Sequence, residues 1–375
     1  MFEDRTGTDA LKFDGVSLRY GDSQHSVLPM WVADMDIPPP DNVGQSINAF
    51  LAGHYGYQMQ DIAPAIVDWH GRRHQPVQDH EVVSCQSVIG GIKSVIEALT
   101  QPNDTIALFA PVYAPLIEVV RACHRTPVLI PFDVETGPGR GDLDGIPKNI
   151  AMLVLCNPQN PTGHVWPQNT LVALASLCQR LRIPMVCDEV HSAFVSPTVS
   201  FCSALQLAGD LRQTTIVLQS ATKAYNLAHI PGASYAVIPK ASWQQQVRRC
   251  IEQCHLYSGT LSNVSLMAAY SEQNDGWLKD VSLQIHSNRK QLEQGLAYSS
   301  LAPVNSEATF FCWLDLTALY PSQEQVARLL FADTGIAAND GASFGSPGWV
   351  RLNVATNPNN VTEALKRLQL LWQQI

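Results

Sequence analysis

The sequence has few charged residues and no apolar run long enough to cross a bilayer. Charged residues make up 15% and hydrophobic residues 46% of the 375-residue chain, which fits a globular protein with a large core. The formal net charge of -9 argues against nonspecific binding to nucleic acid, and the lack of a long apolar run argues against a membrane protein. Residues 1–5 are charged and contain no signal-peptide hydrophobic segment, so we expect a cytoplasmic protein.

The cysteines form no clear disulfide or metal-binding pattern. Their number, nine, is odd, and most lie in apolar runs, as Cys156 and Cys187 do, so we expect reduced core residues. Cys250 and Cys254 are four residues apart on a predicted helix, with His255 beside them, which could suggest a metal site. Because no second ligand pair with zinc-type spacing lies nearby, the sequence favours helix packing and predicts no metal.

Apolar strands alternate with helices from about residue 82 onward. Strands are expected at residues 82–84, 105–109, 127–131, 151–156, 185–187, 215–218 and 234–238. Continuous apolar strands separated by helices predict a buried, mostly parallel sheet of the α/β class. Ligands bind at the carboxyl ends of such strands, and residues 157–160, Asp188 and Lys223 fall at those ends.

A long predicted helix at residues 277–298 leads into a second, smaller domain. There the pattern predicts strands at 309–314 and 349–354 and helices at 322–334 and 361–372. Residues 1–28 are polar and irregular and are expected to form an N-terminal arm. We therefore predict a large domain at residues 36–274, with residues 1–35 and 275–375 forming the arm and a small α+β domain.

Lys223 lies just after a predicted strand, among small hydroxyl residues. A lysine half buried there would have a lowered pKa and could attack a carbonyl to form a Schiff base. For a lone lysine, a position in a surface loop is the simpler interpretation. Asp188, at the end of another strand, changes this balance. A Schiff-base lysine with an acidic partner for a pyridinium nitrogen is the signature of pyridoxal phosphate enzymes.

Six motifs occur in the order of a known family. They are residues 29–36 (PMWVADMD), 55–57 (YGY), 157–163 (NPQNPTG), 188–191 (DEVH), 220–223 (SATK) and 351–353 (RLN). Through nearly its whole length the chain resembles fold-type I pyridoxal phosphate enzymes of the class I/II aminotransferase group, in particular the cystathionine β-lyase and cystalysin-type C–S lyases. The resemblance implies pyridoxal 5′-phosphate as cofactor. It also implies a three-layer sandwich around a mostly parallel sheet, as in aspartate aminotransferase, plus a small α+β domain.

The resemblance assigns four residues to the ring of the cofactor. Lys223 would form the Schiff base and later transfer a proton, and Asp188 would bond the pyridinium N1–H. Asn160 would donate to the phenolic O3′, and Tyr113 would stack on the ring. From the residues alone, Asp188 could instead cap a helix, Asn160 could be a turn residue and Tyr113 a core residue.

The remaining assignments concern the phosphate and the substrate. Ile89 and Gly90 would offer backbone N–H groups to the phosphate at a glycine turn that opens a helix, and Ser220 would add its hydroxyl. Tyr57 would reach the phosphate of the neighbouring subunit, which implies a homodimer with its sites at the subunit interface. Arg351 would clamp the α-carboxylate of an amino-acid substrate. Alternatively, the glycines serve chain geometry, Tyr57 packs within its own turn, and Arg351 forms a surface salt bridge.

Three positions depart from the family pattern. Ala193 stands where a second acid is usual, His229 where glycine is common, and Gly90 where proline is frequent. We expect Ala193 and His229 to alter the rim of the pocket, so the sequence does not identify the substrate. His191 matches the family, and a supporting role is favoured over acid–base work.

The expected reaction is α,β-elimination by a C–S lyase acting on cystathionine or an S-substituted L-cysteine. It would give a thiol, pyruvate and ammonia. An aminotransferase uses the same lysine, aspartate and arginine and stays an alternative. A third possibility is a regulatory protein that binds pyridoxal phosphate with little catalysis.

Overall fold

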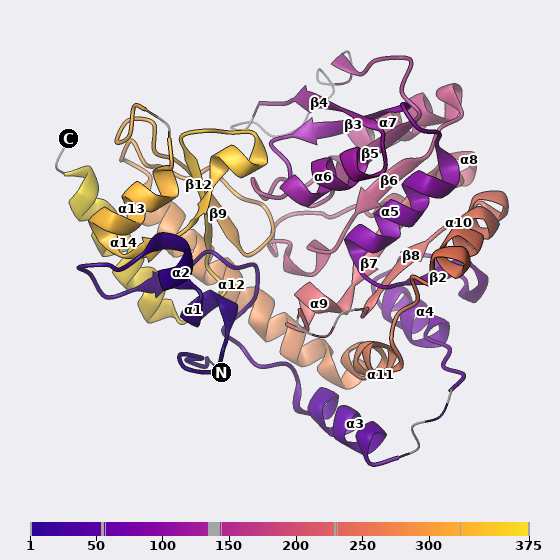
Figure 1. The fold of residues 1–375 in the computed structure, drawn as a ribbon, viewed down its shortest axis with the longest axis horizontal. Coiled ribbons are helices and arrows are strands. Elements are labelled where there is room, and N and C mark those ends of the chain that lie inside the picture. Colours follow the sequence, from indigo (N-terminus) through magenta and orange to yellow (C-terminus); the bar gives the residue numbers. More distant parts are fainter. Residues whose placement is uncertain are drawn as a thin grey trace.

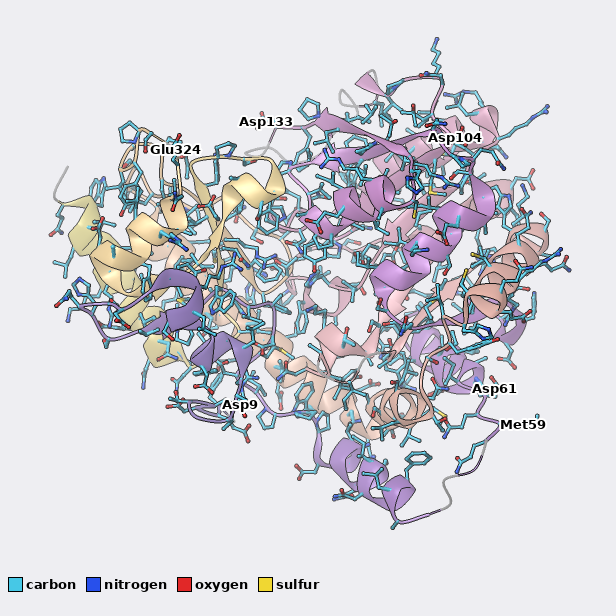
Figure 2. All side chains as sticks on the ribbon, viewed as in Figure 1. Asp9, Met59, Asp61, Asp104, Asp133 and Glu324 are labelled. Carbon is cyan, nitrogen blue, oxygen red and sulfur yellow. The ribbon has the colours of Figure 1, made fainter. Side chains whose placement is uncertain are left out.

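A long helix, α12 (Asp275–Leu296), joins two lobes of the protein (Figure 1). The structure, a computed structural model, describes residues 2–53, 56, 58–133, 143, 145–228, 230, 232–322 and 324–373. The N-terminal arm lies on the smaller lobe, beside the C-terminal helices (Figure 1). Figure 2 shows how side chains fill the space between the ribbons of both lobes.

The larger lobe is built on a seven-stranded sheet with the order β2-β8-β7-β6-β5-β3-β4. These strands are β2 (Val82–Cys85), β3 (Thr105–Ala110), β4 (Thr126–Pro131), β5 (Met152–Cys156), β6 (Met185–Asp188), β7 (Thr215–Ser220) and β8 (Ser234–Val237). Strands β3 to β7 pair in parallel with their neighbours, whereas β8 is antiparallel to both β7 and β2. The expected mostly parallel sheet is confirmed.

Helices cover both faces of this sheet, which explains why its strands are apolar throughout. In β5, Met152 and Val154 pack into the core on one face, and Leu153 and Leu155 pack into the core on the other. The first face is covered by α5 (Val88–Leu99), α6 (Ala114–Ala122) and α10 (Ala241–Cys254). The second is covered by α4 (Ala63–Gly71), α7 (Gln168–Leu181), α11 (Thr260–Ala269) and α12. The remaining helices of this lobe are α3 (Asp41–Leu51), α8 (Gly209–Arg212) and α9 (Ala221–Ala224).

The smaller lobe contains a three-stranded antiparallel sheet with the order β11-β12-β9. Its strands are β9 (Phe311–Asp315), β11 (Asn339–Asp340) and β12 (Trp349–Asn353), and helices α13 (Val326–Thr334) and α14 (Pro358–Trp372) pack on it with α12. A two-stranded parallel sheet pairs β1 (Leu28–Pro29) with β10 (Ile336–Ala337) and so attaches the arm to this lobe. The predicted division at residues 36 and 274 stays a prediction.

The N-terminal arm differs from its prediction as an irregular segment. It contains two short helices, α1 (Leu11–Asp14) and α2 (Val16–Tyr20). Lys12 of α1 is buried, and its Nζ lies 2.9 Å from Asp36 Oδ1. A polar composition therefore concealed local order, because the arm is held by this ion pair together with the apolar contacts of Val16 and Tyr20. No described helix is both long enough and apolar enough to cross a membrane.

Candidate active site

The parallel strands bring the motifs at their carboxyl ends to one edge of the sheet. Asp188 is the last residue of β6, Ser220 is the last residue of β7, and Asn157 follows β5. The Asn157 N–H donates to the Asp188 carbonyl oxygen across 2.9 Å. Because β5, β6 and β7 are neighbours, the sequence correctly placed these three motifs together.

A cavity of about 820 Å³ lies between this edge, the N-terminal arm and the smaller lobe. Lys223 and Tyr113 line it from the large lobe, and Arg351 lines it from β12. The segment from Trp31 to Asp34 and the arm residues Glu3, Arg5 and Thr8–Leu11 complete much of the wall. Residues from three distant parts of the sequence therefore enclose one space.

Lys223 lies on the short helix α9, directly after β7. Ser220 caps this helix, because its Oγ accepts from the Thr222 N–H at 3.0 Å. The half-buried Lys223 Nζ donates to the Ala33 carbonyl oxygen at 2.7 Å. Burial, and to a smaller extent the positive charge of Arg351, lower the pKa of Lys223 to about 8, against the opposing effect of Asp34 and Asp188. Lys223 is therefore not a surface lysine, and its amine becomes nucleophilic near neutral pH.

Asp188 is a buried carboxyl with little hydrogen bonding of its own. Its Oδ1 accepts from the Val190 N–H at 3.2 Å, and the following short helix, at Ser192–Phe194, is preceded by His191 as its cap residue. Asp188 is thus not a helix cap. Burial raises the pKa of Asp188 to about 6, and the Lys223 charge opposes this rise. A cationic N–H partner would stabilise this carboxylate.

Arg351 is 3% exposed, so it is not a surface residue. Its Nη1 donates to Asn160 Oδ1 at 2.8 Å, and its guanidinium carbon lies 3.9 Å from the centre of the Phe311 ring. The Arg351 Nε has no hydrogen-bond partner among the described residues. Burial lowers the pKa of Arg351 to about 9. A buried cation facing a cavity with an unused N–H is suited to bind a carboxylate.

Asn160 and Tyr113 lie beside this arginine. Asn160 is 4% exposed, and its Oδ1 is occupied by Arg351, which leaves its amide N–H groups to donate elsewhere. Tyr113 directly precedes α6 and is half-buried. Burial raises the pKa of Tyr113, against the effect of Arg351, so the phenol stays neutral. Tyr113 lines the Lys223 cavity and Asn160 contacts Arg351, and the predicted roles of both residues stay predictions.

The predicted phosphate turn lies at the start of α5, but its form differs from the expectation. The helix begins at Val88, so Gly90 and Gly91 lie in its first turn rather than before it. The Gly90 N–H donates to Ser87 Oγ at 2.9 Å. A Cβ on Gly91 would lie 2.8 Å from a Leu218 methyl group, so this glycine serves the close approach of α5 to β7.

Strand register places this turn near Ser220. Cys85 at the end of β2 pairs with Ser234, and Ser234 pairs with Ser220. The Ser220 hydroxyl lies 2.7 Å from the Ala233 carbonyl oxygen, to which it can donate. Phosphate binding by Ile89, Gly90 and Ser220 stays a prediction.

The sequence missed the residues that hold the Lys223 helix against the segment from Met30 to Ile37. Asn226 Nδ2 donates to the carbonyl oxygens of Met35 and Ile37 at 2.8 and 2.7 Å. Asn353 Nδ2 donates to the carbonyl oxygens of Val32 and Asp34, both at 2.6 Å. Both asparagines stand in recognisable motifs, but their partners lie more than 180 residues away, so spacing gave no signal for these contacts.

The remaining positions that the sequence analysis singled out have different outcomes. Tyr57 and His229 lie outside the described residues. Ala193 lines a separate cavity of about 510 Å³ with Trp69, Arg73 and residues of α12, and it is not part of the Lys223 cavity wall. The expectation that Ala193 alters the pocket rim stays a prediction. His191 is buried against Phe310 and Phe311 with ring centres 5.3 Å apart, and burial holds its pKa well below the usual range.

Comparison with known proteins identifies the family. The sequence profile of aminotransferase class I and II matches residues 21–368. The chain belongs to this family.

Several known proteins match almost the whole chain. "Cystathionine beta-lyase PatB" of Bacillus subtilis is 24% identical over 98% of this chain and 97% of its own length. A PLP-bound protein of Clostridium difficile 630, classed by inference as an aminotransferase, is 27% identical with a TM-score of 0.91, covering 99% of this chain and 98% of that one. Cystalysin of Treponema denticola has the same fold, with a TM-score of 0.91 at 20% identity, over 100% of this chain and 98% of that one.

The lowered pKa of Lys223 predicts how this family member reacts with aldehydes. The neutral amine fraction falls about tenfold per pH unit below the pKa, so the uptake rate of pyridoxal phosphate by apoprotein should rise to about pH 8 and then level off. Stopped-flow absorbance measures this rate, with Nα-acetyl-lysine as the control for titration of the aldehyde itself. A rate that keeps rising to about pH 10, as for an ordinary lysine, would contradict the lowered pKa.

Arg351→Lys should weaken turnover without releasing the cofactor. Lysine offers a point charge in place of a fork, so we expect a loss of about 2–4 kcal/mol in transition-state stabilisation, or about 30- to 1000-fold in kcat/KM. Steady-state kinetics and cofactor absorbance on one sample measure both effects. The exposed Arg180→Lys is the matched control and should change neither. Full activity in Arg351→Lys, or loss of the cofactor, would exclude the carboxylate role.

Proposed function

We propose that this chain is a C–S β-lyase that cleaves cystathionine or another S-substituted L-cysteine to a thiol, pyruvate and ammonia. The observation that carries the proposal is the cavity that combines the Lys223 amine with the Arg351 guanidinium, beside the buried Asp188 carboxyl. The name of the Bacillus subtilis relative, cystathionine β-lyase, supports this reaction because that protein matches nearly the full chain.

The residues around the cavity fit pyridoxal phosphate. Lys223 supplies an amine for the aldehyde, and Asp188 supplies a desolvated carboxyl that a pyridinium N–H would stabilise. The amide of Asn160 is free to donate, since only its oxygen is engaged by Arg351. The PLP-bound relative at 27% identity supports the same cofactor. The chain is a pyridoxal phosphate-dependent enzyme.

Arg351 would bind the α-carboxylate of the substrate in a bidentate contact. Its Nε has no partner in the part of the chain that the structure describes, while Nη1 is held by Asn160 and the guanidinium lies against Phe311. These contacts fix the plane of the fork before substrate arrives, which lowers the entropic cost of orienting the Cα–H bond. Substrate binding also supplies the anion that this buried cation lacks.

Lys223 would move the proton at Cα. When bound, pyridoxal phosphate withdraws the electron pair left at Cα, which allows the Cβ–S bond to break. The Lys223 amine takes the proton from Cα, and the departing sulfur leaves with its electron pair and is protonated to the thiol. Asp188 would hold a proton on the pyridine nitrogen throughout. Water then converts the remaining three-carbon unit to pyruvate and ammonia.

An aminotransferase is the second candidate, because the matching family profile is that of class I and II aminotransferases. It would use Lys223, Asp188 and Arg351 in the same places and return the proton to the cofactor rather than expel a β-substituent. The two reactions therefore differ in their need for an oxo acid and not in these three residues.

Assembly and location belong to the same proposal. We expect a homodimer in which Tyr57 of one subunit reaches the phosphate site of the other, and we expect it in the cytoplasm.

Pyruvate formation tests the lyase proposal most simply. Purified holoenzyme with cystathionine, and no oxo acid, should release pyruvate that a coupled lactate dehydrogenase assay detects. Lys223→Ala should lower the rate by about 10²- to 10⁴-fold, because the proton-transfer base is gone. Turnover that requires an added oxo acid, with no pyruvate in its absence, would contradict the lyase and support the aminotransferase.

A further inference from the structure

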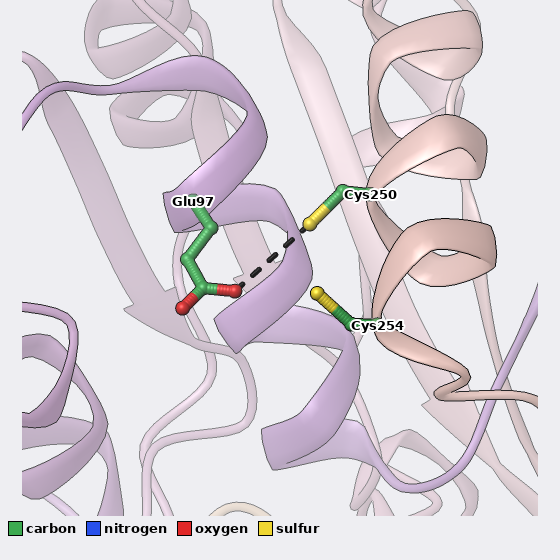
Figure 3. Close-up of side chains that lie close together, drawn as sticks. All are labelled: Glu97, Cys250 and Cys254. Atoms are coloured by element: carbon green, nitrogen blue, oxygen red, sulfur yellow. Dashed lines mark hydrogen bonds between the residues drawn. The ribbon is translucent and has the colours of Figure 1, made fainter.

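A cluster of two cysteines and a glutamate lies between α5 and α10, on the outer side of the large lobe (Figure 3). Glu97 lies near the carboxyl end of α5, and Cys250 and Cys254 lie in the last turns of α10. Their ligand atoms all lie within 4.8 Å of one another. Figure 3 shows both cysteine side chains extending from α10 toward the Glu97 carboxylate. Glu97 could not be linked to the two cysteines from spacing, because it precedes Cys250 by 153 residues.

The spacing of the cluster matches a small tetrahedral site. In a tetrahedral zinc site with Zn–S near 2.3 Å and Zn–O near 2.0 Å, neighbouring ligand atoms are about 3.5–3.8 Å apart. Cys250 Sγ already lies 3.9 Å from Glu97 Oε2. Cys250 and Cys254 lie four residues apart and so share one helix face. Small side-chain rotations would bring the three ligand atoms to coordination distance.

Electrostatics at the cluster favour a cation. Lys93 Nζ donates to Glu97 Oε1 at 2.5 Å, which leaves Oε2 directed at the cysteines. Burial raises the pKa of Cys250, and Cys254 and Glu97 raise it further because each of them would place a negative charge beside a thiolate. The resulting pKa is about 11. The buried Cys123 thiol and Glu97 also interact unfavourably as anions. The carboxyl ends of two helices add negative dipole ends at the same place.

We propose that Glu97, Cys250 and Cys254 bind Zn²⁺, with two thiolates and one carboxylate oxygen as ligands. The ion displaces one proton from each thiol to solvent, and a water molecule occupies the fourth position beside the exposed Cys254. Thiolate ligands select Zn²⁺ over Mg²⁺ and Ca²⁺, which prefer sites built of oxygen atoms.

A zinc ion here would join two helices that pack on the same face of the sheet. It would hold the end of α5 to the end of α10, and α5 begins at the turn proposed to bind the phosphate. An ion that binds only the folded state raises thermal stability in proportion to the logarithm of its concentration. The site does not depend on the reaction proposed above, because none of its residues lines the Lys223 cavity.

Zinc titration of the tag-free holoenzyme tests the proposal. The protein is reduced with a phosphine, freed of excess pyridoxal phosphate and titrated with ZnCl₂ by calorimetry. We expect one ion per chain, and at least about tenfold weaker binding in Glu97→Gln, Cys250→Ser and Cys254→Ser. Cys202→Ser and Glu252→Gln are the matched controls, because neither residue belongs to the cluster, and they should bind as the parent does.

Native mass spectrometry and cofactor absorbance on each variant establish that it is folded and loaded. Unchanged binding in the double variant Cys250→Ser/Cys254→Ser would overturn the proposal. So would the absence of saturable binding by the parent protein. A Cys250–Cys254 disulfide that forms in air even with one equivalent of zinc present would also overturn it and would assign the pair to thiol oxidation.

Discussion

The Lys223 amine lies in a cavity that also contains the Arg351 guanidinium. The site depends on the free-energy cost of keeping these two cations out of water. Burial is the largest cause of the lowered pKa at both residues. Asp188 has the opposite problem, because burial raises the pKa of its carboxyl. Among the described residues, neither Asp188 nor Arg351 forms an ion pair, and a pyridinium ring and a carboxylate substrate would supply the missing partners. Ligand binding at such a site offsets the free-energy cost of desolvating these groups. The lowered pKa of the amine lies near the pH at which the amine must react.

The segment from Met30 to Ile37 bridges the two lobes, which also contact each other directly where Arg351 donates to Asn160. One carbonyl oxygen of this segment, that of Ala33, accepts the Lys223 Nζ. Asn226 holds the segment from the side of the large lobe, and Asn353 holds it from β12, next to Arg351. The positions of the Lys223 amine and the Arg351 guanidinium are therefore both set by contacts with one stretch of backbone. A shift of the small lobe would move the carboxylate-binding residue relative to the Lys223 amine.

Much of this was predictable because strand-end motifs in a parallel sheet must meet at one edge. Asp188 follows a wholly apolar strand, and Lys223 follows another, so their proximity needed no knowledge of side-chain contacts. The arm was mispredicted because its order comes from isolated contacts, such as the ion pair of Lys12 with Asp36 and the packing of Val16, which have no periodicity in sequence. The glycine turn was shifted because Ser87 caps α5, so the helix begins at Val88, before the glycines rather than after them. A motif gives order along the chain and not the direction in which a side chain points, so the sequence could not show that Ala193 lines a separate cavity.

The central claim is that Lys223 is the amine that carries the cofactor, and chemical reduction tests it most directly. Treatment of the pyridoxal phosphate-loaded protein with borohydride, followed by proteolysis and mass spectrometry, fixes the cofactor on the lysine that holds it. We predict a single modified peptide that contains Lys223, with parallel loss of the visible absorbance. Modification of another lysine, such as Lys93 or Lys240, with Lys223 unlabelled, would contradict the assignment and with it the proposed site.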